Sequence, residues 1–274
     1  MSEIGLLATL PLARPATARA AEDSEEAEMR RATAMFSAAF DAKTVEEEEA
    51  QWTAILEAYQ CGPESGGWKV DACARAVGNR GNARSRMGKL DAALGDYAAS
   101  IELAPDANEP RLNRGAALEA MGRYADAIDD YRFVPSRDNA DPVAHNNLGN
   151  ALMGLSEYGQ ARGEFHEAVR LAPEFSFAAT NEAVAAFQLG DDTAAFRTWR
   201  SLLRRYPSGL DDARAALAAA LWAVGETAQA EDQLSRVDDV RYKDKDWRLK
   251  FRRWPPRLEA AMDALIKVRP MSGE

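Results

Sequence analysis

The chain has little of the chemistry that enzymes and metal sites use. Only two histidines, His145 and His166, and two cysteines, Cys61 and Cys73, occur among its 274 residues. No phosphate-binding glycine loop, nucleophile elbow or paired-cysteine motif is present. Two thiols without a nearby histidine would also leave a tetrahedral metal site half filled. We therefore expect a non-enzymatic protein with no catalytic residue, cofactor or metal.

Long apolar runs and excess positive charge are also missing. No stretch approaches the roughly 20 apolar residues that a transmembrane helix needs, and the net charge is −10. Because an acidic chain repels the phosphate backbone, nucleic acid is disfavoured as a general partner.

Similar residues recur along the chain every 34 positions. Each repeat carries a small residue, an alanine and an aromatic at fixed offsets: Gly81, Ala93, Tyr97; Gly115, Ala127, Tyr131; Gly149, Ala161, Phe165; Ala183, Ala195, Trp199. Pro105, Pro173 and Pro207 close three of the repeats. Since this period and pattern are typical of tetratricopeptide helix-turn-helix repeats, the chain resembles that family. The resemblance implies an all-α, right-handed superhelical α-solenoid that binds polypeptides.

The repeated residue types have physical reasons. Small residues are needed where the two helices of a repeat pass closest, and the aromatic supplies the apolar bulk that each unit buries. Gly88, Gly122 and Gly190 fit a left-handed turn between the helices. The third repeat has Ser156 there, so we expect that turn to be less well formed.

The pattern divides the chain into four parts. Residues 1–20 are a targeting segment or a disordered tail, and 24–60 form a helical hairpin that is a degenerate first repeat. Residues 74–238 form the solenoid, with four in-phase repeats and a looser fifth. Residues 239–274 are a basic and aromatic capping extension with a final helix. The charged run Glu46–Glu49 is expected to be a solvated helix start, with an acidic binding patch as the less favoured alternative.

Two features flank the predicted hairpin: a sequence that resembles a signal-cleavage site precedes it, and a pair of cysteines follows it. Ala18-Arg19-Ala20 after a short apolar run fits the small-residue rule for signal cleavage, although Glu3 gives the front the wrong charge. Cys61 and Cys73 flank a single loop. A disulfide there would add about 3 kcal/mol in an oxidising compartment. Two buried, reduced cysteines are the alternative.

The predicted binding residues lie on the first helix of each repeat. Asn79, Asn113, Asn147 and Asn181 recur at one position, with Asn82 and Asn150 three residues further along, and Arg75, Arg86 and Arg111 nearby. An amide both donates and accepts, so such a ladder can pair with the backbone of an extended peptide. The resemblance implies this role in a concave groove. The alternative is that these asparagines bond a neighbouring helix.

The last segment interleaves cations with aromatic residues. Its predicted partner-binding residues are Arg241, Lys245, Arg248, Arg252 and Arg253. We expect a cap whose cations face water or the acidic surface. An acidic protein partner is a second possibility, and single-stranded nucleic acid, which such a pattern can also bind, is the least favoured.

Three stretches carry a narrower resemblance. FSFAATNEAVAAFQLGDD, WRSLLRRYPSGLDDARAALAAALWAVGETAQAE and RRWPPRL resemble the plastid tetratricopeptide proteins of plants and algae, some of them targeted to the thylakoid lumen. This resemblance implies a plastid adaptor that holds a client segment during complex assembly or maintenance. The competing function is a structural subunit docked through its convex face and basic tail. The competing locations are the cytoplasm or, for a secreted protein, the exterior.

Overall fold

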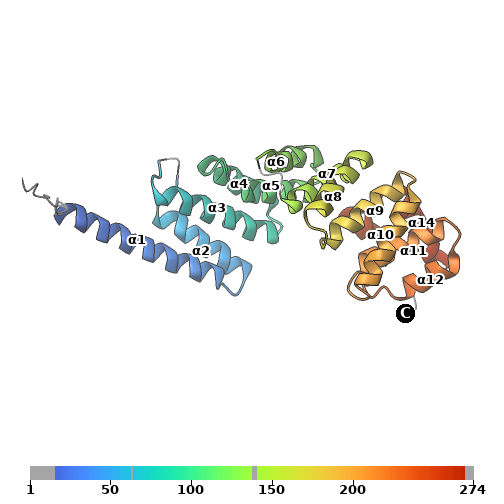
Figure 1. The fold of residues 1–274 in the computed structure, drawn as a ribbon. Helices are drawn as coiled ribbons and strands as arrows, with labels where there is room; N and C mark the ends of the chain where they lie inside the picture. The colour runs from blue at the N-terminus through green and yellow to red at the C-terminus, as the bar shows by residue number, and fades with distance from the viewer. Residues whose placement is uncertain (1–15, 63, 138–140, 269–274) are drawn as a thin grey trace, which may run out of the picture. The chain divides into compact units, whose positions relative to one another are not determined.

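The computed structural model describes residues 16–62, 64–137 and 141–268, and every regular element within these ranges is a helix (Figure 1). The all-α prediction is confirmed. The chain forms two compact units, Met1–Pro105 and Asp106–Glu274, whose boundary falls inside the segment 74–238 that we predicted as one solenoid. Most of the predicted targeting segment lies outside the described residues. Among the described helices, none is both long and apolar enough to cross a bilayer.

Unit 1 contains α1 (Ala16–Phe40), α2 (Val45–Ala58), α3 (Trp68–Arg86) and α4 (Leu90–Leu103). The predicted hairpin corresponds to α1 and α2, where Trp52 is fully buried beside Ala39. Met29 and Phe40 of α1 are 44% and 61% exposed. Since α1 packs against α2, only one narrow stripe of its surface is covered.

A disulfide links the hairpin to the first full repeat. Cys61, just after α2, is bonded to Cys73 in α3, with the two Cα atoms 5.4 Å apart. Of the two alternatives that the sequence left open, the structure contains the bonded form. The bond closes the loop between α2 and α3 and so limits how far the two helices can separate.

Unit 2 contains four helix pairs, α5 (Glu109–Ala120) with α6 (Tyr124–Arg137), α7 (Pro142–Gly154) with α8 (Tyr158–Leu171), α9 (Ser176–Gln188) with α10 (Asp192–Arg205), and α11 (Asp211–Ala223) with α12 (Thr227–Ser235). The first helices contact one another in sequence: α5 with α7, α7 with α9, and α9 with α11. We call the surface they form the inner surface of unit 2.

Close approach of paired helices explains the small residue and the aromatic of each repeat. A Cβ atom built on Gly149 would lie 2.5 Å from the ring of Phe165, and one on Gly115 would lie 2.6 Å from Tyr131. Such distances leave no room for any side chain. The second-helix alanines 93, 127, 161 and 195 are all fully buried.

The turn between α7 and α8, the third of the repeat turns, has the same left-handed backbone conformation as the other repeat turns. Ser156 adopts φ +62°, close to the +74° of Gly88 and Gly122 at the equivalent positions. Its backbone closes the turn through Ser156 N–H to Met153 O at 3.0 Å and Glu157 N–H to Leu152 O at 2.9 Å. The turn that we expected to be less well formed therefore has full hydrogen bonding, with a non-glycine residue in a strained backbone region.

After α12 the chain returns to the inner surface. It passes through η1 (Val240–Lys243), α13 (Lys245–Trp247) and the π-helical turn η2 (Arg248–Arg252) to α14 (Pro256–Val268). Helix α14 packs against α11 and α9 (Figure 1), with Leu258, Met262 and Leu265 fully buried. As a result, residues 213–221 of α11 are buried without interruption.

Candidate functional site

Three asparagines form an amide cluster on the inner surface of unit 2. Asn181 of α9 donates from Nδ2 to the Oδ1 atoms of Asn146, at 3.3 Å, and Asn150, at 3.2 Å, both in α7. Its own Oδ1 accepts from Nη2 of Arg252 at 3.3 Å. For Asn181 the alternative interpretation therefore holds, because its amide joins neighbouring first helices.

Two consecutive arginines of the returning chain bind acidic residues of the inner surface. Arg252 donates to both carboxylate oxygens of Asp212 in α11, from Nε at 2.8 Å and from Nη2. Arg253 lies 3.3 Å from Oε1 of Glu119 in α5. Asp212 and Glu119 expose only 11% and 10% of their side chains. Charges this well covered need partners, so the two pairs hold the chain against the first helices.

Burial shapes the protonation of Glu119. Desolvation raises the pKa of this carboxyl, whereas the charge of Arg253 and the hydroxyl of Tyr131, which donates to Glu119 at 2.9 Å, lower it. The net direction is upward. The phenol of Tyr131 is also buried beside this carboxylate, and its pKa is raised in turn. Glu119 is thus a buried acid whose charged form is favoured by a cation from the returning chain.

Arg248 has a different role from its neighbours. It is fully buried and donates to Glu259 at 3.0 and 2.6 Å, to Asp263 at 2.6 Å and to the carbonyl of Tyr242 at 2.7 Å. Our prediction that the tail cations face water or the acidic surface is wrong for this residue, which holds its own segment together. Arg241 and Lys245 are the exposed members of the predicted set, and they pair with Asp239 and Asp263.

The other predicted groove residues are divided between the two units. In unit 1, Asn82 accepts from Tyr97 Oη at 2.9 Å and donates to Asn79 at 3.4 Å. Arg75 lies over the ring of Phe36, and Arg86 pairs with Glu48. In unit 2, Asn113 and Asn147 are half-buried, and Arg111 lies 3.7 Å from the ring centroid of Phe133.

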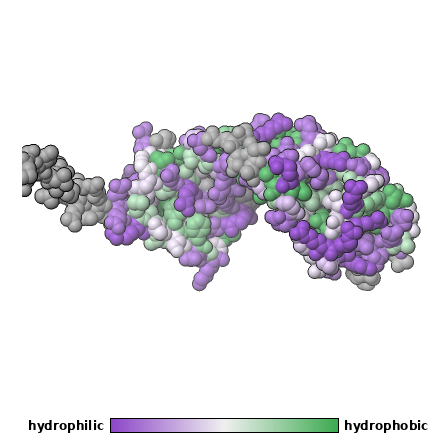
Figure 2. All heavy atoms as spheres, viewed as in Figure 1, coloured by the Kyte–Doolittle hydropathy of each residue, from purple (hydrophilic) through white to green (hydrophobic). Residues whose placement is uncertain are grey.

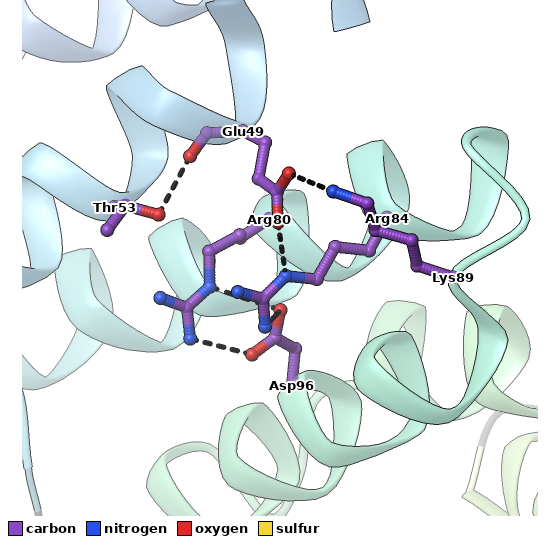
Figure 3. Close-up of polar contacts among 6 residues, drawn as sticks. All are labelled: Glu49, Thr53, Arg80, Arg84, Lys89 and Asp96. Carbon is purple, nitrogen blue, oxygen red and sulfur yellow. Dashed lines mark hydrogen bonds and ion pairs between the residues drawn. The ribbon is translucent and has the colours of Figure 1, made fainter. Parts of the chain in front are cut away.

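An ion-pair network joins three helices of unit 1 (Figure 3). Glu49 of α2 accepts from Arg84 and from Lys89, each at 2.8 Å, and Arg84 also binds Asp96 of α4 at 2.9 Å. Arg80 makes two bonds to the same Asp96, at 3.1 and 2.7 Å. The run Glu46–Glu49 lies at the start of helix α2, as predicted, but the side chains of Glu48 and Glu49 are only 18% and 20% exposed and are not fully solvated. Hydrogen bonds from Lys89 and Arg84 lower the pKa of Glu49.

Each of the two histidines lies beside a glutamate. His145 is buried with Nδ1 2.7 Å from Glu164, and the exposed His166 lies 3.1 Å from Glu182. No cluster of three or more His, Cys, Asp or Glu side chains suited to a metal occurs among the described residues.

On the face shown in Figure 2, hydrophilic residues predominate and hydrophobic ones form separate patches.

Sequence reasoning missed Asn146, Glu119 and Asp212. Asn146 directly precedes a predicted site residue but does not recur at the 34-residue period, so it was not selected. Glu119 and Asp212 become significant only through arginines 134 and 40 positions away in the chain. A spacing pattern on one helix carries no signal for such contacts.

Comparison with known proteins supports the repeat assignment. Residues 79–142 and 146–209 match the tetratricopeptide repeat family. Protein FlbA of Caulobacter vibrioides is 30% identical over 160 residues, which are 56% of this chain and 27% of that protein. The Hsp70-Hsp90 organizing protein of Triticum aestivum is 30% identical over 134 residues, 49% of this chain and 21% of that protein. The chain thus spans about a quarter of the length of these relatives.

Solved structures agree on the fold. A tetratricopeptide repeat protein from Parabacteroides merdae superposes with a TM-score of 0.65 at 16% identity, covering 87% of this chain and 98% of that one. PilF of Pseudomonas aeruginosa gives a TM-score of 0.56 at 17% identity, covering 74% and 95%. The helix pairs, the glycine–aromatic contacts and these matches agree on a tetratricopeptide-like repeat fold, with the family match covering residues 79–142 and 146–209.

Proposed function

We propose that this protein is a non-enzymatic adaptor whose inner surface binds an extended segment of another protein. Tetratricopeptide repeats generally mediate protein–protein interactions. The observation that carries the proposal is that a segment of the chain itself lies on this surface, with Arg252 bonded to the amide of Asn181 and to Asp212. A surface that holds a segment of its own chain through side-chain amides and carboxylates has the chemistry to hold a segment of another protein.

The finer proposal concerns place and process. The resemblance to plastid tetratricopeptide proteins supports a role in assembling or maintaining a plastid complex. A thylakoid-lumen location would suit the bond between Cys61 and Cys73, since disulfides persist in oxidising compartments. Cell fractionation of the native source, with blotting of plastid and lumenal fractions, tests this part. Recovery of the protein outside plastids would refute it.

Binding to the inner surface is tested by a capture experiment. Asn113→Ala with Asn147→Ala changes two half-buried amides on the first helices α5 and α7. Each lost hydrogen bond costs about 1 kcal/mol net, so the pair should weaken client capture roughly 10- to 30-fold. The matched control, Gln160→Ala with Gln229→Ala, removes two exposed amides from the second helices α8 and α12. Equal capture by both variants would favour the competing function, a structural subunit docked through other faces.

A further inference from the structure

The segment 248–257, RLKFRRWPPR, lies on the inner surface of unit 2 like a bound ligand; we call it the docked segment. It reaches three of the four first helices. Arg252 contacts Asn181 of α9 and Asp212 of α11, and Arg253 contacts Glu119 of α5. Arg257 continues the contact at the end of α9, 3.8 Å above the ring of Phe187, with Asp192 beyond it.

The recognition has a defined chemistry. Each of the three arginines combines a carboxylate partner with an aromatic ring: Arg252 lies 5.8 Å from Phe177, Arg253 lies 5.5 Å from Tyr124, and Arg257 lies over Phe187. The guanidinium of Arg252 meets Asp212 with two donors, a geometry that lysine cannot reproduce. Trp254 is 3% exposed between these cations. The inner surface is therefore matched to closely spaced arginines beside an aromatic residue.

The docked segment is imperfectly accommodated. Arg253 has φ +50° and ψ +41°, a left-handed conformation that a non-glycine residue adopts at a cost, and it directly follows a π-helical turn. Among the described residues, the buried Nε1 of Trp254 and Nε of Arg253 have no hydrogen-bond partner. A cavity of about 370 Å³ also remains beside the segment, lined in part by Phe177, Tyr242 and Trp247. A ligand without these defects would bind the same surface better.

We propose that the inner surface of unit 2 is a receptor for arginine- and aromatic-rich peptide segments of partner proteins, which displace the docked segment from it. This inference rests on the proposed function and specifies the partner's chemistry. The anchoring of Arg248 by Glu259 and Asp263 keeps the docked segment attached to α14. A tethered segment competes at an effective concentration in the millimolar range, so partners must outbind it to gain access.

Binding in trans is the direct test. The probe is a fluorescent peptide with the sequence of residues 246–258, DWRLKFRRWPPRL, titrated with the full chain and followed by anisotropy. We expect the Arg252→Ala/Arg253→Ala chain to bind it at least tenfold more tightly than the wild-type chain, because its own segment no longer competes. When Glu119→Gln and Asp212→Asn are added to the Arg252→Ala/Arg253→Ala chain, its gain in affinity for the peptide should disappear. A control peptide with lysines in place of Arg252 and Arg253, equal in charge, should bind at least tenfold more weakly.

A second variant keeps the test decisive if the double-alanine chain fails to fold. Glu119→Gln leaves the sequence of the docked segment unchanged and removes the carboxylate that pairs with Arg253. Amide hydrogen exchange in residues 249–254 should then rise several-fold, while residues 258–265 of α14 stay protected. Unchanged exchange, or equal peptide affinity in all chains, would identify a permanent structural cap and overturn the proposal. Binding of a single-stranded RNA 12-mer that Arg252→Ala/Arg253→Ala abolishes would also overturn it.

The outcomes separate this inference from the proposed function. If Asn113→Ala/Asn147→Ala impairs client capture but the arginine peptide does not bind, the adaptor function stands and the assigned partner chemistry is wrong. If the peptide binds but Asn113→Ala/Asn147→Ala leaves client capture unchanged, the inner surface is still a receptor for arginine-rich peptides. The proposal that the client also binds through the asparagines of this surface is then wrong.

Discussion

At the scale of single residues, the contact between a first-helix glycine and the aromatic of the second helix sets the spacing of each pair. The glycines at 81, 115 and 149 leave no space for a Cβ atom next to the rings of Tyr97, Tyr131 and Phe165. The fourth repeat has Ala183 there, opposite the larger Trp199, and both are buried. This helix pair therefore has a methyl group at the position where the other three have none.

Gly149→Ala should destabilise the protein by about 1–3 kcal/mol, because the new methyl group would overlap the ring of Phe165 and force the helices apart. The matched control is Gly163→Ala in α8 of the same repeat, where the added Cβ meets nothing within 4 Å. That change should stabilise by about 0.5–1 kcal/mol through helix propensity. Urea unfolding of both variants measures the difference. Destabilisation of similar size in both would mean that close helix approach is not the cause.

Ser156→Gly should raise the free energy of unfolding by about 0.5–1 kcal/mol, since Ser156 occupies the left-handed region at φ +62°. The reverse experiment is Gly122→Ser at the equivalent turn, φ +74°, which should lower stability by a similar amount. Thermal unfolding of the two variants is the measurement. A loss of stability on Ser156→Gly would show that the serine side chain contributes more than its backbone strain costs.

At the scale of helices, charged residues far apart in the sequence join one repeat to the next. Glu49 of α2, Arg84 of α3 and Asp96 of α4 form a chain of ion pairs across three helices of unit 1 (Figure 3). The side chains of Glu49 and Arg84 are each about one-fifth exposed. Such partly covered networks contribute more than isolated surface pairs, which are worth roughly 0–1 kcal/mol.

The Glu49 network predicts a loss of stability in acid. Hydrogen bonds from Lys89 and Arg84 lower the pKa of Glu49 below its ordinary 4.5 in the folded state. Its contribution is therefore present above pH 4.5 and disappears as the pH falls through the lowered folded-state value. Lys89→Met should raise the pKa of Glu49 and reduce the stability difference between pH 6 and pH 3. NMR titration of the Glu49 carboxyl with paired urea melts measures both, and an unchanged pKa in the variant would contradict the account.

At the scale of the whole molecule, sequence reasoning succeeded where the information was local and repeated. The 34-residue period located the helix pairs, because each repeat must place its small residue, alanine and aromatic at the same close contacts. It failed where contacts join distant parts of the chain. The docked segment reaches Glu119 and Asp212, and Glu49 reaches Lys89, through pairings that no periodicity records. We predicted that residues 239–274 form a cap, but Arg252 and Arg253 lie on the inner surface, which we predicted to bind a client.

The central claim is that the inner surface of unit 2 binds an extended segment of a partner protein. Site-specific photo-crosslinking tests it most directly, with a benzophenone amino acid placed at Ala116, exposed on the first helix α5, or at Gln160, exposed on the second helix α8. After irradiation in native extract, mass spectrometry identifies the partner residues attached at each position. The account predicts a crosslink from position 116 to one short arginine- and aromatic-containing partner segment, and none from position 160. Partner crosslinks from position 160 alone would contradict it.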